Sequence, residues 1–192
     1  MNLTKLFEMQ RELDRRIVKE KGLENEYLLP RKILALQVEL GECANEWRGF
    51  KFWSKNQKPR TEFTQPCFEC NGEDIGMECH RCEGEGYEVK SNPLLEEYID
   101  CLHFILSIGL IDDLYTYIGA FDPVTSENIT QAYNRVFMAV VDVSEDFDTY
   151  EYQMLLEFFF GLGKMLGFTW EQIEAAYIAK NEVNHNRQST GY

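Results

Sequence analysis

The sequence has little positive charge and no long apolar run. Its 192 residues include 19 Lys and Arg against 33 Asp and Glu, a formal net charge of -14. A surface of that sign repels phosphate backbones, so we expect no nucleic-acid partner. The two longest apolar runs, at residues 99–111 and 155–167, are broken by Asp100, His103 and Lys164. Neither run can span a bilayer, so we expect no membrane association.

The N-terminus lacks the apolar core of a signal peptide, so we expect a cytoplasmic protein. In the cytosol, the six Cys residues are expected to be metal ligands or buried thiols rather than disulfides.

Strand patterns and internal repeats are nearly absent, whereas helical periodicity dominates. Pro30 suits the first turn of a helix, and Asn92 before Pro93 is an N-cap signal. Thr169 and Gln172 have capping-box spacing. We therefore predict an all-α fold, a helical bundle with helices over residues 3–22, 30–44, 93–109, 126–143, 150–166 and 169–186. The exception is the Gly-, Pro- and Cys-rich stretch 50–90. We expect a single domain, 1–192, in which residues 54–92 are a small insert between the second and third helices.

Four cysteines in the insert have the spacing of a zinc site. Cys67 and Cys70 form one C-x-x-C knuckle, and Cys79 and Cys82 form a second. Two such knuckles present four thiolates to one tetrahedral Zn²⁺, and because protein sulfur would fill all four positions, the zinc would be structural. The alternatives are two redox pairs or incidental thiols, which the duplicated spacing disfavours.

Two predicted helices carry acidic pairs at i and i+3, Glu39 with Glu42 and Glu97 with Asp100. Residues at this spacing are neighbours on one helix face. If the four carboxylates converged, they would repel one another unless cations compensated. Oxygen ligands without His or Cys favour Mg²⁺ or Mn²⁺. On the pattern alone, a solvated acidic face is the simpler interpretation.

Taken together, these motifs resemble the all-α nucleoside triphosphate pyrophosphatase superfamily. Within it, the chain resembles the dimeric dUTPases of bacteria, phages and trypanosomatids more than the MazG group. The resemblance covers most of the chain outside the insert and rests on four segments: LFEMQREL at residues 6–13, ELGE and KFW within 39–53, residues 97–107, and KNEVNHNRQ at 180–188. It implies the all-α pyrophosphatase fold and a homodimer, to which the apolar run 158–160 would contribute an interface unless the core buries it.

The resemblance also implies Mg²⁺-dependent hydrolysis of dUTP to dUMP and pyrophosphate, with dUDP as a further candidate substrate. Glu39, Glu42, Glu97 and Asp100 would be the catalytic acids and would ligate two or more Mg²⁺ ions, or Mn²⁺ ions, that bridge the phosphates. These ions would act as Lewis acids and activate a water directed at the β-phosphate. Glu42 is the candidate to take the proton of that water.

The same resemblance assigns the substrate contacts. Gln10 would read the base, Phe104 would stack on it and Trp53 would close the pocket, while His103 and Asn184 would lie near the sugar. The remaining contacts, to phosphate and to the base side, would come from Lys51, Lys180, Arg187 and Tyr192. Without the resemblance, the aromatic side chains would be interpreted as core residues and His103 as a buried histidine with satisfied hydrogen bonds.

Two rival functions remain open. A MazG-like pyrophosphohydrolase acting on another nucleotide, such as dCTP, would share the acids and differ only in base specificity. A non-catalytic interaction protein would instead present the zinc knuckle to a partner. Asp14 is a departure from the resemblance, because it stands where relatives can carry Asn and offers the base only acceptors when ionised.

Overall fold

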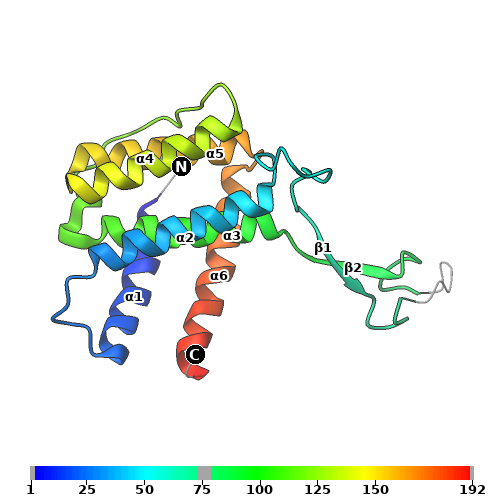
Figure 1. Cartoon of the computed structure of the whole chain (residues 1–192). Coiled ribbons are helices and arrows are strands. Elements are labelled where there is room, and N and C mark those ends of the chain that lie inside the picture. Colours follow the sequence, from blue (N-terminus) through cyan, green and yellow to red (C-terminus); the bar gives the residue numbers. More distant parts are fainter. Residues whose placement is uncertain (1–2, 73–78, 191–192) are drawn as a thin grey trace.

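The structure is a computed structural model that describes residues 3–72 and 79–190, and it confirms the all-α prediction (Figure 1). Each predicted helix is present, and a short helical segment that the sequence analysis did not predict, η2, follows α3. In chain order the elements are α1 (Thr4–Lys21), α2 (Leu29–Trp47), β1 (Phe63–Pro66), β2 (Tyr87–Ser91), α3 (Pro93–Gly109), η2 (Ile111–Tyr117), α4 (Ile129–Glu145), α5 (Thr149–Met165) and α6 (Trp170–Thr190).

The helix ends follow local signals in the sequence. α1 ends at Gly22, whose φ of 67° is a left-handed conformation that glycine adopts without strain. The Asn92 side chain caps α3 by accepting a 3.0 Å hydrogen bond from the Leu95 backbone N–H. Thr169 and Gln172 exchange the two hydrogen bonds of a capping box before α6. The cap at Asn92 marks the start of α3, the helix that carries the acidic pair Glu97 and Asp100.

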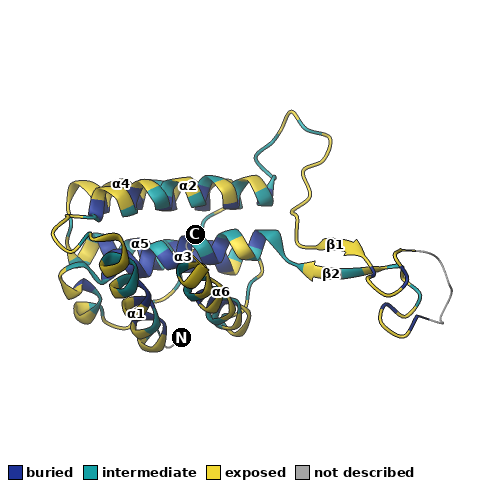
Figure 2. Cartoon of the chain, turned by 90° about the horizontal axis from the view of Figure 1, so that it is seen from below, coloured by how far each residue is buried: buried dark blue, intermediate teal, exposed yellow. Residues whose placement is uncertain are grey.

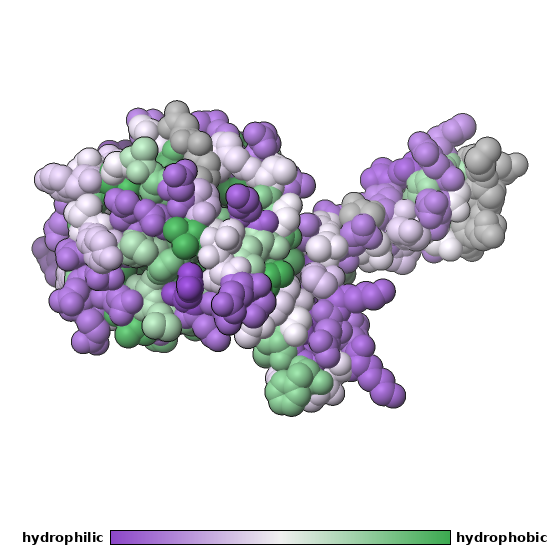
Figure 3. Space-filling view, turned by 90° about the horizontal axis from the view of Figure 1, so that it is seen from above, coloured by the Kyte–Doolittle hydropathy of each residue, from purple (hydrophilic) through white to green (hydrophobic). Residues whose placement is uncertain are grey.

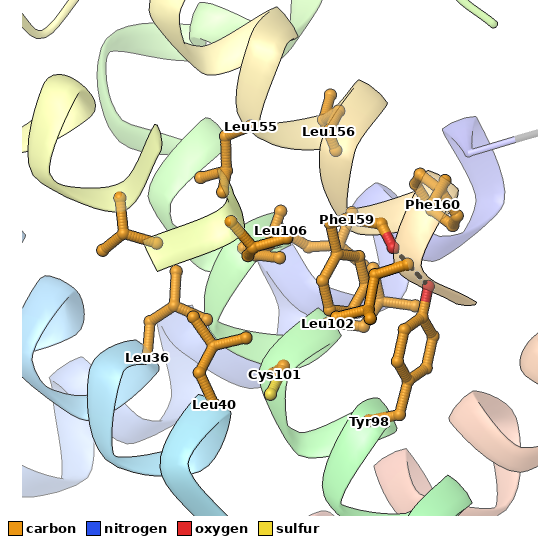
Figure 4. Close-up of a cluster of buried hydrophobic side chains, with 14 of the residues drawn as sticks. Leu36, Leu40, Tyr98, Cys101, Leu102, Leu106, Leu155, Leu156, Phe159 and Phe160 are labelled. Carbon is orange, nitrogen blue, oxygen red and sulfur yellow. Dashed lines mark hydrogen bonds between the residues drawn. The ribbon is translucent and has the colours of Figure 1, made fainter. Parts of the chain in front are cut away.

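Helix α3 is the central element of the body and contacts α1, α2, α5 and α6. Its side chains are buried over most of its length (Figure 2). Leucines of α2, α3 and α5 meet in the core, where Tyr98 stacks on Phe159 with ring centroids 4.3 Å apart (Figure 4). The Tyr98 hydroxyl donates to the Phe159 carbonyl at 3.1 Å, and Gly163 leaves room for it because a Cβ there would clash with the tyrosine. Since burial of each large apolar side chain stabilises the fold by about 1.5–3 kcal/mol, α3 is held firmly in place.

The apolar run 158–160 belongs largely to this core. Phe159 is fully buried and Phe160 is 3% exposed, whereas Phe158 is only partly buried. The core alternative therefore holds for Phe159 and Phe160, and these two side chains are not available to a partner chain.

The non-helical stretch forms a two-stranded hairpin that projects from the helical body (Figures 1 and 2). β1 and β2 are antiparallel, with Phe63 opposite Ser91 and Pro66 opposite Tyr87. All of β1 is exposed, and the described part of the hairpin surface is mainly hydrophilic (Figure 3). We propose that residues 1–192 form one domain, in which residues 54–92 are an insert. Among the described residues, no helix combines the length and the apolarity that a membrane crossing requires.

Candidate active site

Three carboxylates from two helices meet at one point. Glu39 of α2, together with Glu97 and Asp100 of α3, places one oxygen per residue within 4.8 Å of the other two. All three side chains are partly buried. The i, i+3 spacing puts Glu97 and Asp100 on one face of α3, and the packing of α2 against α3 brings Glu39 to them. This donor set of hard oxygens suits a divalent cation such as Mg²⁺.

The negative charge of the cluster is only partly compensated by protein groups. Burial, followed by the charges of Asp100 and Glu42, raises the pKa of Glu39 to about 6. The same causes, with Glu39 added, raise the pKa of Glu97 to about 7. Glu42 itself is exposed and lies outside the group of three, but its charge contributes to the raised pKa of both Glu39 and Glu97. A cation placed here would be stabilised by all four acids.

Lys180 of α6 supplies a positive charge beside the cluster. Its Nζ lies 2.5 Å from Asp100 Oδ2, and each side chain is 21% exposed. The charge of Lys180 lowers the pKa of both Glu39 and Glu97, against the larger effect of burial. One ammonium group therefore offsets only part of the negative charge of the acids.

A pocket of about 260 Å³ opens beside the acids, between α1, α2, α3 and α6. Its lining includes the predicted site residues Gln10, Glu39, Asp100, His103, Phe104, Asn184 and Arg187. The lining residues that were not predicted as site residues are Leu13, Asp14, Ile17, Ser107 and Gln188. The pocket therefore brings predicted residues from four helices together.

A buried hydrogen-bond network forms one wall of this pocket. The side-chain oxygen of Gln10, Oε1, lies 2.7 Å from both His103 Nδ1 and the Tyr177 hydroxyl. Because an amide oxygen only accepts, His103 carries its proton on Nδ1, and Nε2 is an acceptor. Burial, followed by the charge of Lys180, lowers the pKa of His103 to about 3, so the ring is neutral at pH 7. His103 Nε2 and Gln188 Oε1 are buried acceptors without a hydrogen-bond partner in the part of the chain that the structure describes. They suit N–H or O–H donors of a bound molecule.

Asp14 is occupied by internal partners. Its carboxylate accepts from Gln10 Nε2 at 2.6 Å, from Ser107 Oγ at 2.5 Å and from Lys32 Nζ at 3.1 Å. It therefore orients the Gln10 amide, with Nε2 toward Asp14 and Oε1 toward His103. Helical spacing could have revealed two of the unassigned residues, because Asp14 follows Gln10 by four positions and Ser107 follows His103 by four.

Three residues that were predicted to contact the substrate either do not line the pocket or fall outside the residues that the structure describes. Trp53 is 66% exposed and packs edge-on against Phe50 and Phe52. Lys51 lies over the Phe50 ring, with its Nζ 5.5 Å from the centroid. Neither residue lines the pocket. Tyr192 lies outside the described residues. The roles of all three stay predictions.

The all-helical fold and the convergent carboxylates beside the pocket fit an all-α enzyme of the nucleoside triphosphate pyrophosphohydrolase class. The model of one protein family, the dUTPases, matches residues 2–66 and 84–192. Since this match spans nearly the whole chain, the protein belongs to the dUTPase family and is a dUTP diphosphatase. Such enzymes generally use a divalent metal. A search of curated proteins found no match. The family match leaves out residues 67–83, which carry all four cysteines of the insert.

Proposed function

We propose that the pocket binds dUTP and that Glu39, Glu42, Glu97 and Asp100 hold two or more Mg²⁺ ions against its phosphates. The convergence of Glu39, Glu97 and Asp100 within 4.8 Å is the observation that carries this proposal. The raised pKa values of Glu39 and Glu97 fit it, because a site built for cations concentrates negative charge when only protein groups are considered. Carboxylate oxygens without His or Cys suit Mg²⁺, and Mn²⁺ would fit the same ligands.

When bound, the cations would act as Lewis acids on the phosphate oxygens and lower the pKa of an attacking water. The protein groups orient the reactants. Lys180, whose Nζ lies 2.5 Å from Asp100 Oδ2, would bind a phosphate oxygen of the substrate. Glu42 is exposed on the same helix as Glu39 and is our candidate to accept the proton of the water. Hydrolysis would release dUMP and pyrophosphate.

Other residues that line the pocket would hold the nucleoside. Phe104 is partly buried and lines the pocket, so its ring offers a face for stacking. Neutral His103 would accept a hydrogen bond through Nε2, and Gln10 retains one N–H beyond the one that it gives to Asp14. Asn184 and Arg187 of α6 line the same pocket and would contact sugar and phosphate. We also propose that Trp53 closes over the ligand, and that Lys51 and Tyr192 contribute to the contacts with phosphate and with the base side.

We also propose that the protein is a homodimer. Apolar side chains are exposed on adjacent helices, Leu34 and Val38 on α2 and Met138 and Val141 on α4. Each of these side chains is about half exposed or more. A second copy of the chain would cover this face through an isologous contact.

The test is an assay of pyrophosphate release with Mg²⁺ and each deoxynucleoside triphosphate, with phosphate release from dUDP measured alongside. We expect dUTP to be hydrolysed far faster than dCTP, and Glu39→Gln to abolish turnover. Glu12→Gln is the matched control, because Glu12 is exposed on α1 and lines no part of the pocket. Faster turnover of dCTP would favour the MazG-like alternative. Full activity of Glu39→Gln would disprove the proposed role of the acidic cluster.

A further inference from the structure

The four cysteines of the hairpin have the geometry of a tetrahedral metal site. Their sulfur atoms all lie within 4.8 Å of one another, and Cys67 Sγ to Cys79 Sγ and Cys70 Sγ to Cys82 Sγ are each 3.7 Å. With Zn–S bonds of about 2.3 Å, the edge of an ideal ZnS₄ tetrahedron is about 3.8 Å. The distances across the two knuckles therefore match that edge, and all four cysteines are free thiols rather than disulfides.

The two knuckles also share one backbone geometry. Asn71 and Gly72, after the first knuckle, have φ of 50° and 81°, and Glu83 and Gly84, after the second, have φ of 51° and 90°. A non-glycine residue in this left-handed region is uncommon, so its repetition at the same place in both knuckles indicates a shared constraint. The Gly86 backbone N–H also points at Cys82 Sγ, at 3.3 Å. Such bonds stabilise a thiolate that ligates a metal.

Apart from these sulfurs, the hairpin has no core among its described residues. The four cysteines form a buried cluster of their own, separate from the helical core. β1 is exposed throughout, and Phe68, between the cysteines of the first knuckle, is 83% exposed. A loop with so little apolar burial cannot offset the entropy of ordering its chain, so a bound metal must supply the free energy of folding.

Contacts on the body side of the hairpin connect α2 to α3 without involving the four cysteines. The backbone N–H of Arg60 donates to the Glu46 carbonyl at 2.9 Å, and the Leu94 N–H donates to the Arg60 carbonyl at 3.0 Å. Arg60 and Glu46 also form an ion pair at 2.8 Å. These contacts tie the end of α2 to the start of α3 on the body side of the hairpin. The family match omits residues 67–83, so the family pattern does not require the knuckles.

We propose that Cys67, Cys70, Cys79 and Cys82 hold one structural Zn²⁺ that folds the hairpin, and that dUTP hydrolysis does not depend on it. Four thiolates would leave no open position for substrate or water, so the ion has no catalytic role. His80, which is exposed, is not a ligand. The second half of this inference rests on the proposed acidic active site, whereas the zinc site itself does not.

Metal analysis of the purified full-length protein tests the site directly. We expect about one zinc per chain and, after exchange into Co²⁺, the intense sulfur-to-metal charge-transfer bands of tetrahedral thiolate coordination. Cys67→Ser with Cys79→Ser should lose the zinc. Cys43→Ser should keep it, because Cys43 lies in α2 and its sulfur contacts the Tyr133 hydroxyl in the helical core.

Two results would overturn the zinc site: protein without zinc that contains intramolecular disulfides among these cysteines, and zinc retained by the double variant. Activity tests the second half of the inference separately. The double variant should hydrolyse dUTP with Mg²⁺ within about twofold of wild type. If it fails to fold, a chain in which a short Gly-Ser linker replaces residues 67–83 provides the same test. Loss of activity in a folded linker variant would show that the hairpin contributes to catalysis.

Discussion

The acidic cluster and the cysteine cluster differ in what positions their ligands, the helical core or the metal itself. Three carboxylates lie on rigid helices whose positions the core already sets, and they remain partly open to solvent. Four thiols lie in turns that have no core of their own, and they are buried. In the first region the fold would position the metal, whereas in the second the metal would create the fold. The two sites should therefore respond differently to the same kinds of change.

The largest difference should follow from removing one acid. Asp100→Asn removes a ligand and the partner of Lys180 while preserving size, so we expect kcat to fall by about a hundredfold or more. Zinc content should not change, because the cysteine cluster is separate from the helical core that carries Asp100. Steady-state kinetics and metal analysis on the same preparation provide the measurement. A variant that retained more than half of the wild-type kcat would contradict the proposed role of Asp100.

The second difference is in pH dependence. The pKa values of Glu39 and Glu97 rise in the folded chain from 4.5 to about 6 and about 7. The folded state therefore holds these protons more tightly than the unfolded state, and the resulting stability is present below pH 4.5 and is lost as pH rises through 7. Protein freed of Mg²⁺ should unfold at a lower temperature at about pH 8 than at about pH 5.5, and added Mg²⁺ should restore stability at the higher pH.

Glu97→Gln isolates this effect, because glutamine keeps the shape of the side chain without a titrating proton. The difference in melting temperature between the two pH values should shrink in this variant, whereas Glu12→Gln should behave as wild type. An unchanged difference in Glu97→Gln would show that other groups cause the pH dependence.

Much of this arrangement could be predicted from sequence because its signals are local. The cap at Asn92, the stop at Gly22 and the i, i+3 acids act within one or two helical turns, and the structure confirms the helices that they predict. The C-x-x-C spacing is equally local, and the structure brings its sulfurs together.

Features that depend on contacts between distant segments were harder to predict. Asp14 meets Lys32 from α2 and Ser107 from α3, and only the packing of three helices reveals that this carboxylate is satisfied internally. η2 depends on Asp112 and Asp113, whose φ values of 51° and 53° no hydrophobic pattern encodes. The side chain of Trp53 follows the path of a loop, which helical periodicity does not determine.

A smaller effect is expected in local stability, which should differ between the hairpin and the helical body. Cys79→Ser should release the zinc and expose the hairpin to proteolysis within residues 54–92, while the helical body keeps its melting temperature within a few degrees. Limited proteolysis with mass spectrometry, beside far-UV circular dichroism, provides the measurement. Cys101→Ser is the control in α3, where no cleavage in the hairpin is expected. Cooperative loss of the helical signal in Cys79→Ser would mean that the zinc also stabilises the body.

The smallest effect concerns the loop that joins the two regions. Trp53 is 66% exposed, so Trp53→Ala should change the free energy of unfolding by no more than about 0.5 kcal/mol. If the indole closes over a bound base, the same change should raise KM for dUTP about fivefold, the lower end of what a stacking contact supplies. Phe52→Ala is the matched control, because Phe52 is 85% exposed beside Trp53 and has no proposed contact with substrate. An equal KM for Trp53→Ala and wild type would show that the indole packs within the loop and does not contact the substrate. A rise in KM with unchanged stability would show that the loop between the acids and the hairpin moves when substrate binds.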